Sequence, residues 1–363
     1  MANEDKATRY HRLRRRASIA GTALSAVVLL FLLISGGSST LRDISRSSVL
    51  VYVTLLVLLM EIVQLPLAFY LGVTLERRYG LSAETTARWW LDHLKATGVA
   101  LVFAVVGGWI VIGLLLWAPE TWWLWAAVCF GGILVLLAQL APVILLPMFY
   151  ELKPLDRPTL IDRLGALAAR AGVRVLGVFE WRLSDRTRKA NAALAGIGRT
   201  RRILLSDTLL AEHGEEEIEV ILAHELAHHV HRDIWTGIAF EITLMTFGFY
   251  LADLVLTAAP GRFAITGKAD LAALPLLVLT GGAASLALLP LANAMSRAHE
   301  RRADRYALEM TKNAGAFVTA MKRLAAQNLA EERPSRLVEV LFYSHPPMAA
   351  RIEAARAWEA NRM

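Results

Sequence analysis

The residues that could do chemistry are concentrated in one short stretch, HELAHHVHRD, at 224–233. We predict one helix over 214–233, because acidic residues suit its first turn and apolar residues recur at helical spacing. His224 and His228 would then lie one turn apart on one face, the spacing at which two imidazoles bind one zinc ion. Glu225 stands beside them and could take a proton from a zinc-activated water. The alternative is a solvated, charged helix end just before a membrane span.

The neighbouring histidines do not complete such a site. At 3.6 residues per turn, His229 points about 100° away from the face of His228. His231 shares that face, but its Cα would lie about 10.5 Å along the axis from that of His224. No glycine breaks the helix to fold it back, so a metzincin arrangement with a third histidine after a glycine turn is excluded. The third ligand must come from another part of the chain.

A second candidate segment, SRAHERRADRYALEM at 296–310, is also helical in pattern. Glu300 and Asp304 are four residues apart, so one carboxylate could bind the metal while the next orients a ligand histidine. The four arginines of this segment leave open an ordinary salt-bridged surface helix. The only cysteine, Cys129, lies within an apolar run, so we expect neither a disulfide framework nor a thiolate metal site. Any transition metal must be bound by histidine and carboxylate.

The elements that must position these residues are membrane helices. Hydrophobic residues make up 56% of the 363 residues and the mean hydropathy is +0.44, whereas soluble domains are roughly 45 to 50% apolar. Buried helices of a large soluble core would show a polar face, and the first run is too long for a signal peptide. Since a span needs roughly 20 apolar residues, we predict a mainly α, polytopic helical membrane protein with about six spans, at 17–36, 49–73, 97–117, 122–148, 234–257 and 271–295.

The spans divide the chain into segments of different character. Four spans occupy 1–148 and two occupy 234–295, whereas the charged segments 149–233 and 296–363 face water. Lys and Arg crowd the N-terminus and the loop after the second span, so the positive-inside rule places both termini and both water-facing segments in the cytoplasm. The net charge of +7 fits that topology. With no nucleic-acid motif present, we expect the lipid bilayer and no nucleic acid as a partner.

Several motifs, in order along most of the chain after residue 60, resemble the type I CAAX prenyl endoproteases. These are integral membrane zinc metallopeptidases, and the bacterial HtpX-type membrane proteases are more distant relatives. The matching stretches are LERRYGLS at 75–82, LLPMFYELKPL at 145–155, NAALAGIG at 191–198, RRILLSDTLL at 201–210, HELAHH at 224–229, SRAHERRAD at 296–304 and YSHPPMAARI at 343–352.

Taken position by position, the resemblance implies one zinc ion per chain, held by His224, His228 and Glu300. It assigns Glu225 as general base and later proton donor, and it makes Asp304 the group that supports a ligand histidine. Proteolysis in this family uses a water activated by the zinc ion.

The resemblance also implies that Asn191 and His345 stabilise the tetrahedral intermediate, with Arg351 in support. An amide and an imidazole can donate hydrogen bonds to a developing oxyanion. From the residues alone two alternatives stay open, because the His345 segment is also a plain helix start with proline in its first turn and Asn191 could be a turn residue. The stretch 191–205 could form an ordinary hairpin or the exposed edge strand of a small sheet that holds an extended peptide. The resemblance favours the edge strand.

Several polar residues lie inside predicted spans, among them Glu61, Gln64, Glu241 and Asp253. Such residues are costly in hydrocarbon unless they face protein or water. They indicate a polar cavity between the helices, which the resembled family is known for. The eukaryotic enzymes of that family carry one N-terminal span more than this chain.

We therefore expect a membrane-embedded zinc endopeptidase whose peptidase part includes a small β-sheet. Two substrate classes stay open, the region near a lipidated C-terminus and membrane proteins clipped in quality control. Outside the proteases, the alternative is a metal-free membrane scaffold or transporter. An intramembrane protease does not fit, because the motif lies in a charged helix ahead of the span. The richness in alanine and arginine indicates a bacterial chain, which would lie in the cell inner membrane.

Overall fold

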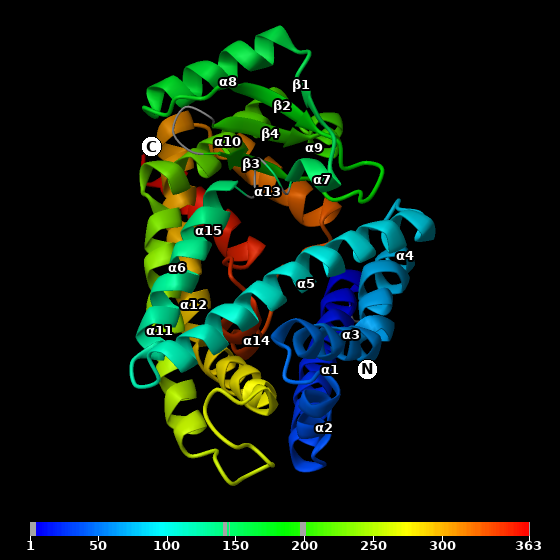
Figure 1. Cartoon of the computed structure of the whole chain (residues 1–363). Helices are drawn as coiled ribbons and strands as arrows, with labels where there is room; N and C mark the ends of the chain where they lie inside the picture. The colour runs from blue at the N-terminus through cyan, green and yellow to red at the C-terminus, as the bar shows by residue number, and fades with distance from the viewer. Residues whose placement is uncertain (1–4, 141–143, 145, 197–200, 363) are drawn as a thin grey trace.

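The fold combines a set of long helices with a smaller unit that contains a sheet (Figure 1). In this computed structural model, residues 5–140, 144, 146–196 and 201–362 are described. Within them, six helices are long and apolar enough to cross a membrane, which confirms the predicted polytopic helical fold. They are α1 (Lys6–Ile34), α3 (Val49–Phe69) with its continuation through a π-helical turn (Tyr70–Thr74) into α4 (Leu75–Arg78), α5 (Thr86–Trp117), α6 (Trp122–Leu140), α11 (Asp233–Thr257) and α12 (Leu274–Thr311) with the 3-10 turn Leu271–Ala273 before it.

Two of these helices extend well beyond their apolar stretches. The basic residues at the start of the chain belong to α1 itself, ahead of the apolar run predicted at 17–36. α12 has 38 residues, which at 1.5 Å each gives a rod of about 57 Å, roughly twice the thickness of a hydrocarbon core. The predicted span at 271–295 and the candidate residues at 300 and 304 therefore belong to one continuous helix. The fourth span, predicted at 122–148, begins as predicted, and 141–143 and 145 lie outside the described residues.

The smaller unit is built around a four-stranded mixed sheet with the order β1-β2-β4-β3. Its strands are β1 (Leu152–Pro154), β2 (Gly177–Trp181), β3 (Ala192–Ala195) and β4 (Arg202–Ser206). β2 and β4 run parallel and the other pairs antiparallel. β3 lies at one edge of the sheet and pairs with β4, so among the described residues no strand lies beside its other edge. Residues 197–200, between these two strands, lie outside the described residues.

Helices cover the sheet and complete the core of this unit. α8 (Pro158–Arg170) lies on the outer side of the sheet, away from the long helices (Figure 1). The core joins Ile203 and Leu205 of β4 to Ile218 and Leu222 of α10 (Glu215–Val230) and to Phe317 of α13 (Ala314–Gln327). The remaining helices are short or peripheral: α2 (Gly37–Ile44), α7 (Leu146–Phe149), α9 (Asp207–Glu212), α14 (Arg336–Phe342) and α15 (Met348–Ala360). Burial of these side chains joins the two segments 149–233 and 296–363 into one unit.

The helix predicted over 214–233 is shorter in the structure. Gly214 is its N-cap residue and Glu217 accepts a hydrogen bond from the Gly214 N–H at 3.0 Å, as the acidic first turn predicts. The helix ends at Val230, however, because Arg232 adopts the left-handed conformation with φ of 59°. The next helix, α11, begins at Asp233. The prediction of one helix as far as residue 233 was wrong, since a non-glycine residue makes the turn that ends it.

The polar residues of the spans face protein or a cavity. The amide of Gln64 donates to the carbonyl of Gly21 at 2.7 Å, and Glu61 Oε1 lies 2.5 Å from a ring nitrogen of His93. Asp253 accepts from the buried indole of Trp122 at 2.7 Å and from Lys268 at 2.9 Å. Glu241 lines a cavity of about 330 Å³ between α11 and α12, whose other walls are mostly apolar.

The junction between β4 and α9 generates a testable prediction about stability. The Asp207 carboxylate accepts hydrogen bonds from the N–H groups of Leu183, Ser184 and Thr208. Burial opposes ionisation, but these bonds and the Ser184 hydroxyl outweigh it and hold the pKa of Asp207 below its ordinary value. We expect Asp207→Asn to lower the melting temperature in detergent at neutral pH.

The pH dependence of that loss has a definite sign. A carboxyl with a lowered folded pKa stabilises the fold above its unfolded pKa, and this contribution disappears as the pH falls through the folded value. The difference between wild type and Asp207→Asn should be full above about pH 5 and shrink in acid. Asp185→Asn is the matched control, because the Asp185 carboxylate pairs with the exposed side chains of Arg88 and Arg182 and with no backbone N–H group among the described residues. Equal melting temperatures for the two variants at pH 7 would contradict the prediction.

Candidate metal centre

The two predicted histidine ligands lie on one face of α10. Apolar residues on the opposite faces of this helix pack into the core, which leaves His224 and His228 facing α12. Their Nε2 atoms are 3.3 Å apart and their rings meet at 85°. Both imidazoles therefore present the same nitrogen to one point, as the four-residue spacing predicts.

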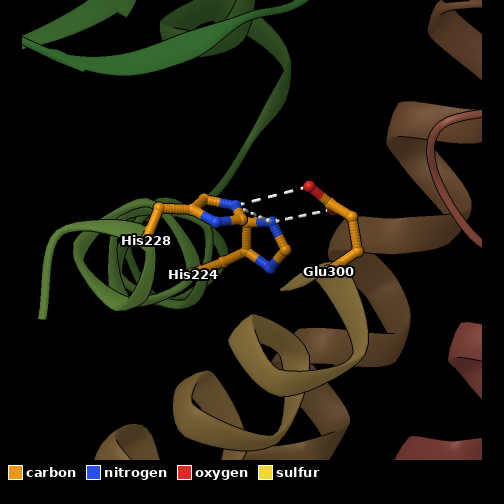
Figure 2. Close-up of side chains that lie close together, drawn as sticks. All are labelled: His224, His228 and Glu300. Atoms are coloured by element: carbon orange, nitrogen blue, oxygen red, sulfur yellow. Dashed lines mark hydrogen bonds and ion pairs between the residues drawn. The ribbon is translucent and has the colours of Figure 1, made fainter. Parts of the chain in front are cut away.

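The carboxylate of Glu300 reaches the same point from α12. Its Oε2 lies 3.2 Å from His224 Nε2 and its Oε1 lies 3.4 Å from His228 Nε2, and Figure 2 shows the three side chains converging from the two helices. One ligand atom from each residue lies within 4.8 Å of the other two. The structure therefore brings together the three residues that were predicted to bind metal, from positions 76 residues apart in the chain.

The donor set fits a metal ion better than it fits a hydrogen-bonded cluster. Glu300 Oε2 is buried. Two ring nitrogens lie near it, His224 Nε2 and His345 Nδ1, but neither has the geometry of a hydrogen bond. A buried carboxylate oxygen without a hydrogen bond is costly. Two imidazoles and one carboxylate are the protein ligands of many catalytic zinc sites.

Asp304 and Arg351 orient the first histidine. Asp304 Oδ1 lies 2.9 Å from His224 Nδ1, on the far side of the ring from the Glu300 carboxylate. The guanidinium of Arg351, from α15, donates to both oxygens of Asp304, from Nε at 2.8 Å and from Nη2 at 2.5 Å. A proton on His224 Nδ1, held by Asp304, leaves the lone pair of Nε2 for a metal. The predicted support by Asp304 thus has a geometric basis.

Asp233 does the same for the second histidine, and the sequence prediction missed it. Its Oδ2 is hydrogen-bonded to His228 Nδ1 at 2.9 Å, and its Oδ1 accepts from Arg302 of α12. The left-handed turn at Arg232 folds Asp233 back toward His228. The five-residue spacing of His228 and Asp233 is a signal that could have found this contact, but only with the helix break in place.

The site favours positive charge. Burial alone would lower the pKa of His224, but the carboxylates of Asp304 and Glu300 outweigh it and raise that pKa to about 9. The pKa of His228 is also raised, because the Glu300 and Asp233 carboxylates outweigh burial and the neighbouring imidazole. Burial raises the pKa of Glu225, which lies beside the two imidazoles. Anionic groups around a histidine pair stabilise a cation bound between them, whether a proton or a metal ion.

The remaining predicted residues lie at two separate places. His345 precedes α15, its side chain is 60% exposed, and its Nδ1 lies 2.8 Å from Glu300 Oε2. Asn191 is exposed at the start of β3, where its backbone pairs with Ser206. Among the described residues, its side chain makes no hydrogen bond. His345 is therefore in contact with Glu300. Asn191 makes no such contact with a described residue and stands just before β3, the edge strand that packs against α10.

A cavity of about 220 Å³ opens beside the second ligand. It is lined by His228 and Arg232, by Leu194 and Ala195 of the edge strand β3, and by residues of α6 and α11. α10 also packs against β3. An edge strand beside the ligands provides main-chain groups for an extended peptide, and the cavity provides space for a side chain.

Two family descriptions together cover the chain from residue 2 to residue 359. Residues 154–359 match Peptidase family M48. The chain belongs to this family. Residues 2–151 match the N-terminal region of CAAX prenyl proteases, described with five membrane helices, whereas the described part of this region has four candidate spans. This M48 chain is thus a membrane metalloprotease, a metal-dependent enzyme with several spans that acts on peptides or proteins.

Named relatives agree with this assignment. The uncharacterized metalloprotease YhfN of Bacillus subtilis is 30% identical over 97% of this M48 chain and 85% of its own length. CAAX prenyl protease 1 of Saccharomyces cerevisiae is 28% identical over 84% and 71%. Protease HtpX of Glaesserella parasuis is 27% identical over 54% and 72%. The crystal structure of S. mikatae Ste24p superposes with a TM-score of 0.85 and 22% identity over 96% of this chain and 88% of that one, which shows a shared fold.

The contact between Asp233 and His228 generates a prediction about metal affinity. Removing a carboxylate that orients a ligand histidine costs about 10- to 100-fold in metal affinity, so we expect Asp233→Ala to weaken the binding of an added divalent metal ion by that factor. Competition with a calibrated chelator measures it. Asp162→Ala, at an exposed position of α8, is the matched control. The same affinity in both variants would show that Asp233 does not orient the ligand.

Proposed function

We propose that this M48 metalloprotease is a zinc-dependent endopeptidase with one zinc ion per chain, bound by His224, His228 and Glu300. The observation that carries the proposal is the convergence of two imidazole nitrogens and one buried carboxylate, whose Oε2 makes no hydrogen bond to any described residue. Zinc is the metal that such a ligand set binds most often in proteases. Asp304 and Asp233 hold the two histidines with Nε2 toward the metal position.

The other residues divide the remaining steps of peptide hydrolysis. A bound zinc ion would supply Lewis acidity, which favours ionisation of a water and polarises the scissile carbonyl. Glu225, next to the first ligand in the chain, takes the proton of the attacking water and later delivers it to the leaving amine. His345 and Asn191 donate hydrogen bonds to the oxyanion that forms on the carbonyl oxygen. Arg351 acts on this chemistry through Asp304 and His224.

The substrate is bound as an extended strand along β3. Among the described residues one edge of this strand has no neighbouring strand, so its main-chain groups can pair with a peptide, and the cavity of about 220 Å³ beside His228 accepts an apolar side chain. We propose a CAAX-type substrate, cut near a lipidated C-terminus, because the similarity to CAAX prenyl proteases includes the membrane region as well as the peptidase part. Clipping of membrane proteins, the HtpX-type alternative, is the other outcome of the test below.

We also propose that the site faces the cytoplasm. Segments 149–233 and 296–363 share one core and form the peptidase unit, and the membrane regions at 1–148 and 234–295 anchor it. The basic residues at the start of α1 and after the second span support this topology, with both termini inside the cell. If the chain is bacterial, the membrane is the inner one. No nucleic acid has a part in this function.

Metal content and activity test the proposal together. We expect about one zinc per chain in detergent-purified wild type, since the ligands are fixed before the metal binds. Glu300→Ala should lose the zinc, and Glu225→Gln should keep it but lose at least about 100-fold in kcat, because only the proton transfer is removed. Mass spectrometry measures the metal, and cleavage of a prenylated and an unprenylated reporter peptide measures activity on the same samples.

Each alternative has its own outcome in that experiment. Preference for the prenylated reporter supports the CAAX-type substrate, and equal cleavage of both supports the quality-control type. Wild type without zinc, unchanged by Glu300→Ala, would indicate a metal-free scaffold or transporter. Glu309→Ala is the control, because Glu309 lies on the same helix at an exposed position.

The proposed topology predicts which side of the membrane each segment faces. Cys129 is the only cysteine, so single-cysteine variants can be built on Cys129→Ser. In intact cells, a membrane-impermeant maleimide should label Arg262→Cys in the loop between α11 and α12. It should label Asp162→Cys and Arg356→Cys only after lysis. The reverse pattern would place the peptidase unit outside the cytoplasm.

A further inference from the structure

A short segment after α13 connects the first helix, α1, to the residues just before the two proposed oxyanion donors. This bridging segment, Asn328–Glu331, follows α13 and contacts the residues that precede both proposed oxyanion donors. It contains none of the metal ligands. Its contacts form two arms, one toward His345 and one toward Asn191.

The first arm runs through Glu331 to Tyr343. The Glu331 side chain is buried, and its Oε2 accepts from the Tyr343 hydroxyl and from Arg15 Nη1, each at 2.6 Å. The carbonyl of Tyr343 accepts from Arg297 Nη1 at 2.7 Å. Burial and the Glu331 carboxylate raise the pKa of Tyr343 well above its ordinary value, so the phenol remains a donor. Tyr343 is thus fixed by side chain and backbone, two residues before His345.

The second arm runs through Asn328 to Ala190. Asn328 Oδ1 accepts from the Ala190 N–H at 2.9 Å, and its Nδ2 donates to the Ala190 carbonyl at 3.2 Å. One amide side chain therefore holds both main-chain groups of Ala190, as a neighbouring strand would. Ala190 immediately precedes Asn191. The preceding residue, Lys189, is also held, because its Nζ lies 2.9 Å from Glu76 Oε2.

The polar start of the first helix, α1, contacts both arms. His11 Nε2 is hydrogen-bonded to the carbonyl of Leu329 at 3.0 Å, and Arg15 is paired with Glu331. Tyr10 donates to Glu76, the partner of Lys189. The polar turns of α1 before residue 17 thus contact the bridging segment and the approach to β3.

The two oxyanion donors need such support because they are exposed. The His345 side chain is 60% exposed, and Asn191 lies at the surface. Catalytic groups must be held within about 0.5 Å of their productive position, and among the described residues the contact of His345 with Glu300 is the one polar side-chain contact of the two donors. Their position is set by the backbone on which they stand.

We propose that Glu331, Tyr343 and Asn328 are positioning residues that hold His345 and Asn191 in reach of the oxyanion, with α1 as their membrane anchor. This inference rests on the proposed function, since it takes His345 and Asn191 as the oxyanion donors. It assigns the first helix a part in the reaction, although that helix lies far from the metal ligands in sequence.

Two conservative variants test the first arm. Removing one oxyanion donor costs about 100- to 1,000-fold in kcat, so a displaced donor should cost about tenfold. We expect Tyr343→Phe and Glu331→Gln each to lower kcat about tenfold, with KM within about twofold and zinc content unchanged. Glu332→Gln is the matched control, because it makes the same charge change at an exposed neighbour. If Tyr343→Phe and Glu331→Gln match Glu332→Gln in kcat, the proposal is wrong.

A double-mutant cycle separates positioning from general stability. If Tyr343 acts through His345, Tyr343→Phe should change kcat by less than about twofold in a His345→Ala background. The same holds for Asn328→Ala in an Asn191→Ala background. Equal factors in both backgrounds would show that the bridging segment does not act through the donors. That result would overturn the inference, yet zinc binding and the loss of activity in Glu225→Gln would still support the metal site.

Discussion

The buried carboxylate of Glu300 is the constraint on which the rest of the site depends. An anion in the interior needs compensating charge, and the two imidazoles that face it supply none while they are neutral. Around them stand the carboxylates of Glu225, Asp233 and Asp304 and the guanidinium groups of Arg302 and Arg351. Four carboxylates against two guanidinium groups leave an excess of negative charge around the two imidazoles. The surrounding charges therefore favour a cation at the point where the imidazoles and Glu300 meet.

The packing of α10 against α12 converts this charge arrangement into geometry. Each helix is held by a different part of the molecule, α10 by the core of the sheet unit and α12 by the membrane helices as well as that core. Neither segment could form the site alone, because two ligands come from one and the third from the other. The membrane region thus has a direct part in the metal site, through the helix that carries Glu300.

The sequence was sufficient to predict that His224 and His228 share one helix face, from their four-residue spacing, and to predict the six spans, from the length of the apolar runs. It could not predict Asp233 as a partner of His228, since that contact depends on one left-handed residue, Arg232, where no glycine marks the turn. The pairing of Arg351 with Asp304 and the contacts of Glu331 depend on tertiary packing between distant segments. Local propensity carries no information about such pairs. Asn191 and His345 came from resemblance to a family, and the structure adds a contact with the ligand group only for His345.

The continuity of α12 has a consequence for where a substrate can be cut. The apolar part of this helix ends near Met295, and Glu300 follows five residues later in the same rod. At 1.5 Å per residue, Glu300 lies about 8 Å along the axis from the end of the apolar part. An extended peptide covers that distance with two or three residues, at about 3.3 Å each. If the chain cuts membrane-anchored substrates, as proposed, this fixed distance restricts cleavage to the peptide bonds nearest the anchor.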